Sequence, residues 1–162
     1  VLLKVFNFCA QTGVLGAFNC TEAAVTGTMS TADIPGITGD EFAVYLYPGR
    51  QMHHVRRGEK IPVTLEPEEY MLACFAAMHN GAAVLGLTEK YNMAAAIENI
   101  QWRGDTLSVT LLDGGDVAFW CRQAPTRVTA NGIEAAYHYE PESGFLLVQA
   151  HALGHITIEV TT

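Results

Sequence analysis

The chain has 162 residues, 49% of them hydrophobic, a size and content that fit one domain with a sizeable core. Its formal net charge of -8 argues against binding to nucleic acid or to an anionic membrane surface, because both need clustered basic residues, and the 9 Lys and Arg residues here are scattered. No window approaches the roughly 18 uninterrupted apolar residues that a membrane-spanning helix needs.

The first predicted elements form a hairpin of two strands. Leu2 to Phe8 alternates like a core strand, Gln11 to Gly13 contains turn residues, and Val14 to Asn19 returns. The next stretch, Thr21 to Asp40, is rich in Ala, Thr, Ser and Gly and predicts either a small strand or a loop. Because the chain begins at Val1 inside an apparent core strand, without Met or a basic leader, we expect a C-terminal piece of a longer protein.

The segment from Phe42 to Phe75 predicts a meander of strands around which the rest of the chain is organised. An extended chain places side chains alternately on two faces, so the apolar residues from Phe42 to Tyr47 supply both faces of one strand. Pro48-Gly49 predicts a type II turn with the positive φ on the glycine. Gly58-Glu59 predicts a second reversal.

Two further strands complete the meander. Ile61, Val63 and Leu65 alternate with polar neighbours, which predicts a strand buried on one face. The run from Tyr70 to Phe75 is almost wholly apolar, and a strand that is apolar on both faces is one that is buried on both faces. We therefore expect this last strand to lie centrally in its sheet.

The second half of the chain continues with short strands. Thr88 to Ala96 is the only candidate for a helical turn, and Asn131-Gly132 predicts a two-residue hairpin. About ten to twelve short strands separated by turn signals predict an all-β fold, either a sandwich or a barrel, and we favour one antiparallel β-sandwich domain over residues 1–162 with at most one short helical turn. The later strands are expected at Ile97 to Trp102, Thr106 to Leu112, Val117 to Cys121, Val128 to Ala130, Glu134 to Glu140, Gly144 to Gln149 and Gly154 to Thr161.

Six segments resemble a known enzyme family in their order and spacing. They are Gly13 to Cys20 (GVLGAFNC), Ser30 to Gly36 (STADIPG), Phe42 to Tyr47 (FAVYLY), Ile61 to Tyr70 (IPVTLEPEEY), Val84 to Leu87 (VLGL), and Tyr91-Asn92 with Ala95 to Ile97. Together they are similar to the C-terminal β-domain of the raffinose synthase and alkaline α-galactosidase group, also called seed imbibition proteins, within glycoside hydrolase family 36. The resemblance extends over nearly the whole chain.

That resemblance implies a parent enzyme, either an α-galactosidase or a galactosyl transferase, that acts on raffinose-type oligosaccharides. Such enzymes resemble other retaining glycosidases, which use one carboxylate as nucleophile and another as acid and base. In the family these two aspartates lie on an upstream (β/α)8 barrel that no part of this chain matches. The resemblance therefore implies a non-catalytic accessory domain that packs on the barrel, and no catalytic residue here.

The four cysteines predict free thiols. Cys9, Cys20, Cys74 and Cys121 form no C-x-x-C pair, and all four are surrounded by apolar residues, where a thiol behaves as a small hydrophobe. In the predicted hairpin, Cys9 lies beside the turn and Cys20 at the far end, too far apart for a disulfide. Unpaired cysteines favour a reducing compartment such as the cytoplasm.

No metal or cofactor site is predicted. His53 and His54 fall on opposite faces of a strand, so both cannot bind one metal ion. His151 and His155 have a spacing that would suit zinc on a helix, but Gly154 and the β-type residues after it argue against a helix. No phosphate-binding loop or nucleotide fingerprint occurs, and the acidic residues fall mainly at turns and strand ends, as solvated carboxylates do.

Aromatic residues offer one further function, because flat rings stack on the apolar faces of sugars. The candidates are Trp102, Trp120, Tyr45, Tyr47 and Tyr91. Trp120 and Tyr45 lie in apolar segments and are expected in a core or an interdomain contact. Trp102, before a turn, and Tyr91 are the residues that we expect to contact carbohydrate.

Two functions stay open at this stage. One is an accessory domain whose partner is a catalytic barrel, and a large exposed apolar patch on one sheet would favour it. The other is an autonomous carbohydrate-binding module for galactosyl oligosaccharides, favoured by a concave face with parallel exposed rings. A third, that the chain is itself an enzyme, needs an acidic pair in a cleft.

Overall fold

The computed structural model describes residues 1–9 and 11–162, and within those residues it contains sixteen strands and two 3-10 turns. No helix in the described residues is long and apolar enough to cross a bilayer. Every strand pair is antiparallel, as predicted. The 3-10 turns are η1 (Thr31–Asp33) and η2 (Met93–Ala96), of which the sequence predicted only η2.

The strands form four sheets, which we name A to D. Sheet A has the order β1 (Leu2–Cys9), β2 (Thr12–Asn19), β7 (Tyr70–Ala77), β4 (Glu41–Tyr47), β5 (Gln51–Arg56), and sheet B pairs β3 (Val25–Met29) with β6 (Ile61–Leu65). Sheet C has the order β14 (Tyr137–Glu140), β15 (Phe145–Ala150), β11 (Gly115–Cys121), β8 (Ala82–Leu87). Sheet D has the order β13 (Ile133–Glu134), β12 (Arg127–Ala130), β16 (Ile156–Thr161), β10 (Thr106–Leu111), β9 (Ile97–Arg103).

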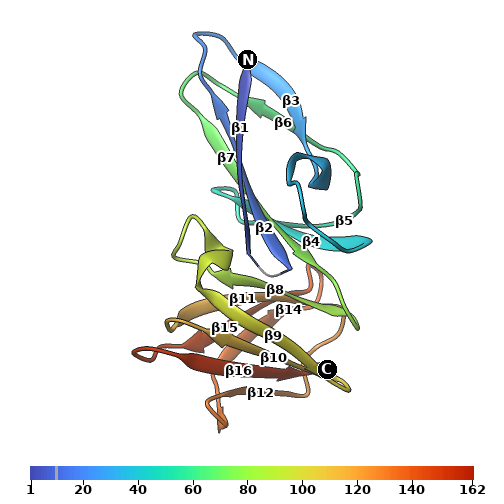
Figure 1. The fold of residues 1–162 in the computed structure, drawn as a ribbon, viewed down its shortest axis with the longest axis vertical. Helices are drawn as coiled ribbons and strands as arrows, with labels where there is room; N and C mark the ends of the chain where they lie inside the picture. Colours follow the sequence, from blue (N-terminus) through green and yellow to red (C-terminus); the bar gives the residue numbers. More distant parts are fainter. Residues whose placement is uncertain (10) are drawn as a thin grey trace.

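The sheets stack along the long axis of the molecule. Sheets A and B form the upper half of Figure 1, and sheets C and D form the lower half. The chain passes from one half to the other at the tight turn between His79 and Ala82, which joins β7 to β8. Sheet A therefore lies against different neighbours on its two faces.

Strands β4 and β7 supply side chains to two separate cores. Phe42 and Phe75 point into a smaller core shared with β3, β6 and η1. Tyr45 and Cys74 point the other way, into a larger core formed mainly by sheets C and D. The central position of β7 in sheet A confirms the prediction made from its two apolar faces.

Strand β1 differs from the prediction of a core strand. It lies at the edge of sheet A and pairs only with β2 among the described residues. Its residues Leu3, Val5, Phe6 and Phe8 are exposed, because nothing in the described chain covers them. Apolar alternation alone cannot show whether a strand has a covering layer.

Local turn signals were informative in part. Asn131 and Gly132 both adopt positive φ, 50° and 78°, in the predicted hairpin between β12 and β13. The chain also turns at Pro48-Gly49, but the positive φ of 52° lies at Arg50 and not at Gly49. Turn composition predicted the reversal but placed the left-handed residue one position too early.

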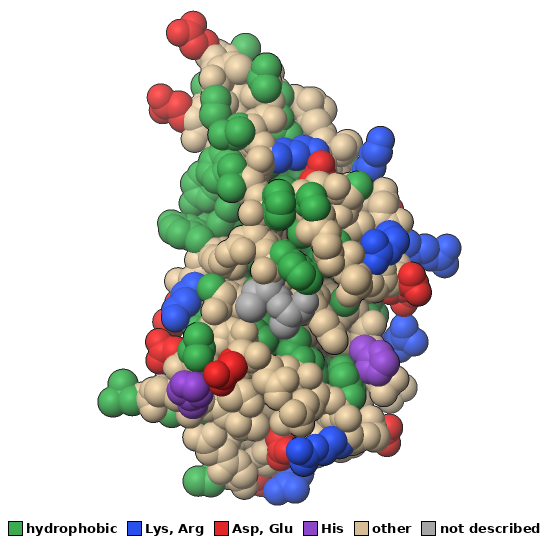
Figure 2. All heavy atoms as spheres, in the orientation of Figure 1, with side chains coloured by type: hydrophobic (Ala, Val, Ile, Leu, Met, Phe, Trp, Pro, Cys, Tyr) green, Lys and Arg blue, Asp and Glu red, His purple; other side chains and the backbone are tan. Residues whose placement is uncertain are grey.

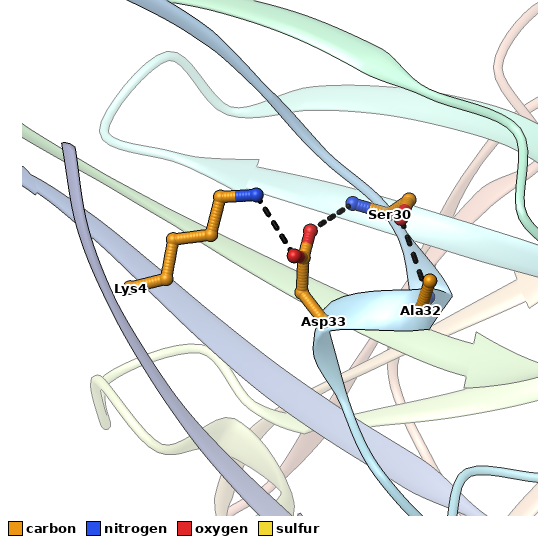
Figure 3. A network of polar contacts seen from close by, with 4 residues as sticks. All are labelled: Lys4, Ser30, Ala32 and Asp33. Atoms are coloured by element: carbon orange, nitrogen blue, oxygen red, sulfur yellow. Dashed lines mark hydrogen bonds and ion pairs between the residues drawn. The ribbon is translucent and has the colours of Figure 1, made fainter.

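The turn η1 is held by a capping network that reaches the edge strand (Figure 3). The Ser30 side chain accepts a hydrogen bond from the backbone N–H of Ala32, and the Asp33 carboxylate accepts one from the backbone N–H of Ser30 at 2.9 Å. The other oxygen of Asp33 lies 2.8 Å from Nζ of Lys4 on β1. One carboxylate thus caps the turn and binds β1.

Asp33→Ala is expected to lower the free energy of unfolding by about 1 to 2 kcal/mol, because it removes the cap and the ion pair together. Urea unfolding followed by circular dichroism measures the loss. Lys4→Met removes the partly exposed ion pair alone and should cost less than about 1 kcal/mol. An equal loss in the two variants would show that the capping bond contributes nothing.

Two cysteines lie in the larger core. The Cys74 thiol donates to the carbonyl oxygen of Leu85 across to β8, at 3.4 Å. Cys121 is also buried, whereas Cys20 is exposed, contrary to the prediction that its apolar neighbours enclose it. The predicted separation of Cys9 and Cys20 cannot be followed to the thiols, because the side chain of Cys9 lies outside the described residues.

Stability is expected to fall at alkaline pH. Burial raises the pKa of Cys121 to about 12 and also raises the pKa of Cys74 well above its ordinary value. The thiols of the unfolded chain ionise near pH 9, while those of the folded chain stay protonated. The contribution of the two thiols to the free energy of unfolding is therefore complete below pH 9 and is lost as pH rises. Between pH 8 and pH 10 we expect a loss of about 3 kcal/mol, measured by urea unfolding. A Cys74→Ala, Cys121→Ala variant should lose this pH dependence; an unchanged slope would contradict the assignment.

Candidate functional site

A cleft of about 740 Å³ opens between sheets A and C. Its apolar lining includes Val14 and Cys74 from sheet A and Met93 from η2. The ring of Tyr45 on β4 stacks on Phe145 of β15, with ring centroids 5.7 Å apart and planes 17° apart. This stack joins the two sheets at the cleft, so the walls belong to rigid strands and not to loops alone.

Tyrosines stand at the edge of the cleft. Tyr91 is 68% exposed and meets Tyr47 edge to face, with centroids 5.7 Å apart, and Tyr70 in the same manner at 6.4 Å. Hydrogen bonding to the Tyr91 side chain raises the pKa of Tyr70 above its ordinary value. Phe18 also stacks on Tyr70, with ring centroids 6.1 Å apart, so the aromatic surface continues along sheet A.

The cleft is also lined by charges of both signs. The cations are Arg50 and Lys90, and the carboxylates are those of Glu89, Asp116 and Glu140. Three of these charged groups interact with neighbouring side chains. Lys90 lies 3.5 Å from Asp113, Asp116 lies 2.9 Å from His151, and Glu140 accepts a hydrogen bond from Ser143 and lies 3.7 Å from His138.

Arg50 and Glu89 differ from the other charged residues of the cleft. Neither forms an ion pair or a side-chain hydrogen bond with another residue in the described part of the chain. Both are exposed, so water satisfies them in the free protein. They leave one donor group and one acceptor group available to a ligand.

This arrangement suits binding more than bond cleavage. Asp116 and Glu140 keep 29% and 51% of their side chains exposed, and both already contact neighbouring side chains. In residues 1–9 and 11–162, no three His, Cys, Asp or Glu side chains converge as a metal site would require. His151 and His155 lie outside any helix and contact different carboxylates, Asp116 and Glu98.

Comparison with known sequences identifies the family. The sequence model of the family described as raffinose synthase or seed imbibition protein Sip1 matches residues 1–150. The chain belongs to this family. The resemblance inferred from six short segments is thereby confirmed, and the all-β fold is the one that it implied.

Curated relatives of this raffinose synthase family member are named as galactinol–sucrose galactosyltransferases or as a stachyose synthase. A galactinol–sucrose galactosyltransferase of Oryza sativa subsp. japonica is 29% identical in a match that covers 86% of this chain and 22% of the relative. A probable galactinol–sucrose galactosyltransferase 1 of Arabidopsis thaliana is 26% identical, covering 90% and 24%. A stachyose synthase of Pisum sativum is 21% identical, covering 85% and 20%. The chain spans less than a quarter of the length of these relatives.

The two residues predicted to contact carbohydrate lie in different places. Tyr91 lines the cleft, whereas Trp102 does not. Trp102 lies on β9, packs against the larger core and meets the His79 ring edge to face at 5.2 Å. Trp120 and Tyr45 are buried, as predicted.

Sequence reasoning missed the residues that complete the cleft in this family member. Arg50, Glu89 and Phe145 come from a turn, a loop and a strand far apart in the chain. The available signal was the shared face of Tyr45 and Tyr47, since the alternation of β4 already placed both on one side.

Proposed function

We propose that this chain, residues 1–162, is a single non-catalytic accessory β-sandwich domain of a raffinose synthase family enzyme. It packs on and stabilises a catalytic (β/α)8 barrel that the chain does not contain. Two findings support this proposal: the family match over residues 1–150, and relatives more than four times as long as the aligned region. The printed names of these relatives support galactosyl transfer in the parent enzyme, and the family resemblance leaves hydrolysis by an α-galactosidase as the other activity.

The observation that carries the proposal is the exposure of β1. Leu3 and Val5 are 49% and 54% exposed on one face of this edge strand, and Phe6 is 47% exposed on the other. Edge strands of stable free-standing sheets are normally protected by charge, Pro or a covering layer. Hydrophobic side chains gather over the upper half of the molecule in Figure 2, whereas fewer of them show on the lower half of that face. Such a surface favours a permanent neighbour.

An autonomous carbohydrate-binding module is the alternative function. The tyrosines beside the cleft favour it, but they leave the exposed apolar residues of β1 without an explanation. A barrel packed on sheet A accounts for that strand. We further propose a reducing compartment, the cytoplasm, because Cys20, Cys74 and Cys121 are unpaired.

The test changes β1 in the full-length enzyme. Leu3→Ser, Val5→Ser and Phe6→Ser together should lower its melting temperature by several degrees and reduce galactosyl transfer from galactinol to sucrose, because they weaken the domain contact. Leu153→Ser is the matched control, since Leu153 is fully exposed in the lower half of the molecule. The chain by itself should form no raffinose and release no galactose.

Two results would refute the accessory role. One is a triple variant that is as stable and as active as the unaltered enzyme. The other is formation of raffinose, or release of galactose from it, by the isolated chain.

A further inference from the structure

We propose that the cleft between sheets A and C binds a neutral oligosaccharide, through the rings of Tyr47 and Tyr91 and the charged groups of Arg50 and Glu89. The volume of about 740 Å³ falls within the range of small-molecule sites, which runs from about 300 to 1,000 Å³. This inference goes beyond the accessory role, and it rests on the proposed function only for the choice of raffinose as the probe.

The aromatic residues determine the shape of a suitable ligand. Tyr47 and Tyr91 meet with planes 72° apart, so they offer two ring surfaces that face different directions. A sugar presents flat C–H faces that pack on such rings, and successive sugar units present them at different angles. Tyr91 holds this position while 68% exposed, which leaves its ring available to a ligand.

The charges determine the polarity of the ligand. Each sugar hydroxyl both donates and accepts, so a sugar can accept hydrogen bonds from Arg50 and donate them to Glu89. Two cations and three carboxylates line the cleft, and this mixture disfavours a polyanion such as a nucleotide, because such a ligand needs clustered positive charge. The same mixture disfavours a polycation. A neutral ligand rich in hydroxyl groups fits both requirements.

Arg50 and Glu89 also point to a ligand by their state in the free protein. The other charged residues of the cleft form ion pairs or side-chain hydrogen bonds within the described chain, whereas these two form neither. Arg50 is held in a left-handed conformation, φ 52°, at the turn after β4, directly beside Tyr47 and Tyr45 on that strand. The turn therefore places the backbone of Arg50 next to the aromatic surface, within reach of a ligand bound there.

Calorimetric titration of the chain with raffinose, and in parallel with maltotriose, tests the proposal. We expect saturable millimolar binding of at least one of the two sugars. Tyr91→Ala should raise the dissociation constant about fivefold to tenfold, because it removes one ring surface. Arg50→Asn, which removes the guanidinium and keeps a residue that tolerates positive φ, should have a similar effect.

The controls separate this cleft from other aromatic sites and from the accessory role. Tyr137→Ala removes an exposed tyrosine that does not line the cleft and should leave binding unchanged. Trp102→Phe should also leave binding unchanged, and loss of binding in that variant alone would assign the sugar to β9. The proposal is overturned by that result, by absence of saturable binding of both sugars, by binding unaffected in both cleft variants, or by preferential binding of ATP or spermine. None of these outcomes depends on the contact made by β1, so the accessory role can fail or stand independently.

Discussion

Replacing Gly86 by alanine is expected to cost roughly 4 kcal/mol or more, a large part of the stability of a domain of this size. Gly86 lies inside β8 with φ of 115°, a conformation that side chains with a Cβ rarely adopt. A Cβ at this position would overlap the carbonyl oxygen of Met93 and lie 2.5 Å from its carbonyl carbon. Both atoms belong to the backbone of η2, so no side-chain rotation can relieve the clash.

Gly36→Ala is the matched control for Gly86→Ala. Gly36 also has a positive φ, 93°, but a Cβ there would meet no atom within 4 Å. Gly36→Ala should therefore lower the free energy of unfolding only by the cost of holding an alanine at positive φ, about 1 to 2 kcal/mol. Urea unfolding of both variants measures the difference. Losses of stability that agreed within about 1 kcal/mol would contradict the close contact between β8 and η2.

The Gly86 contact also connects stability to the cleft. Met93, whose backbone approaches Gly86, also lines the cleft, and Tyr91 lies two residues earlier in the same segment. Displacement of η2 in Gly86→Ala would therefore move one wall of the cleft. Any remaining folded Gly86→Ala protein should bind sugars more weakly than Gly36→Ala does.

Much of the fold could be predicted because the strands carry a clear side-chain period. Strand β6 alternates buried and exposed residues along its whole length, and β7 is apolar on both faces and lies centrally. The local signals at Asn131-Gly132 were equally direct, since both residues can take positive φ without strain. In each case the property that determines the structure is present within a few neighbouring residues.

The candidate site could be predicted less well, because it depends on contacts between distant segments. Tyr91 was identified from its residue type, but nothing in its neighbourhood shows that Tyr47 will meet it. Trp102 was also identified as an aromatic residue next to a turn, and it packs against the larger core. The exposure of β1 was missed for a related reason, since an apolar strand does not reveal whether its covering layer belongs to the same chain.

The second large effect is expected for Phe75→Ala on β7. Phe75 is fully buried in the smaller core and pairs with Gly13 on β2 and Val44 on β4. Removing a buried phenylalanine ring costs about 3 to 5 kcal/mol, because the transfer energy is lost and the rigid strands around the cavity cannot close it. Phe75→Leu keeps most of the volume and should cost less than about 2 kcal/mol.

Because β7 contributes to both cores, Phe75→Ala should weaken the whole chain and not only the upper half. Cys74, the preceding residue, points into the larger core together with Trp120. Disruption of β7 should therefore also destabilise the packing of sheets C and D. Unfolding followed by Trp fluorescence, to which buried Trp120 of sheet C contributes, and by circular dichroism should then give coincident transitions, both shifted to lower urea by the same amount. A fluorescence transition that stayed at the original urea concentration would mean that the two halves unfold independently, which would contradict a single cooperative domain.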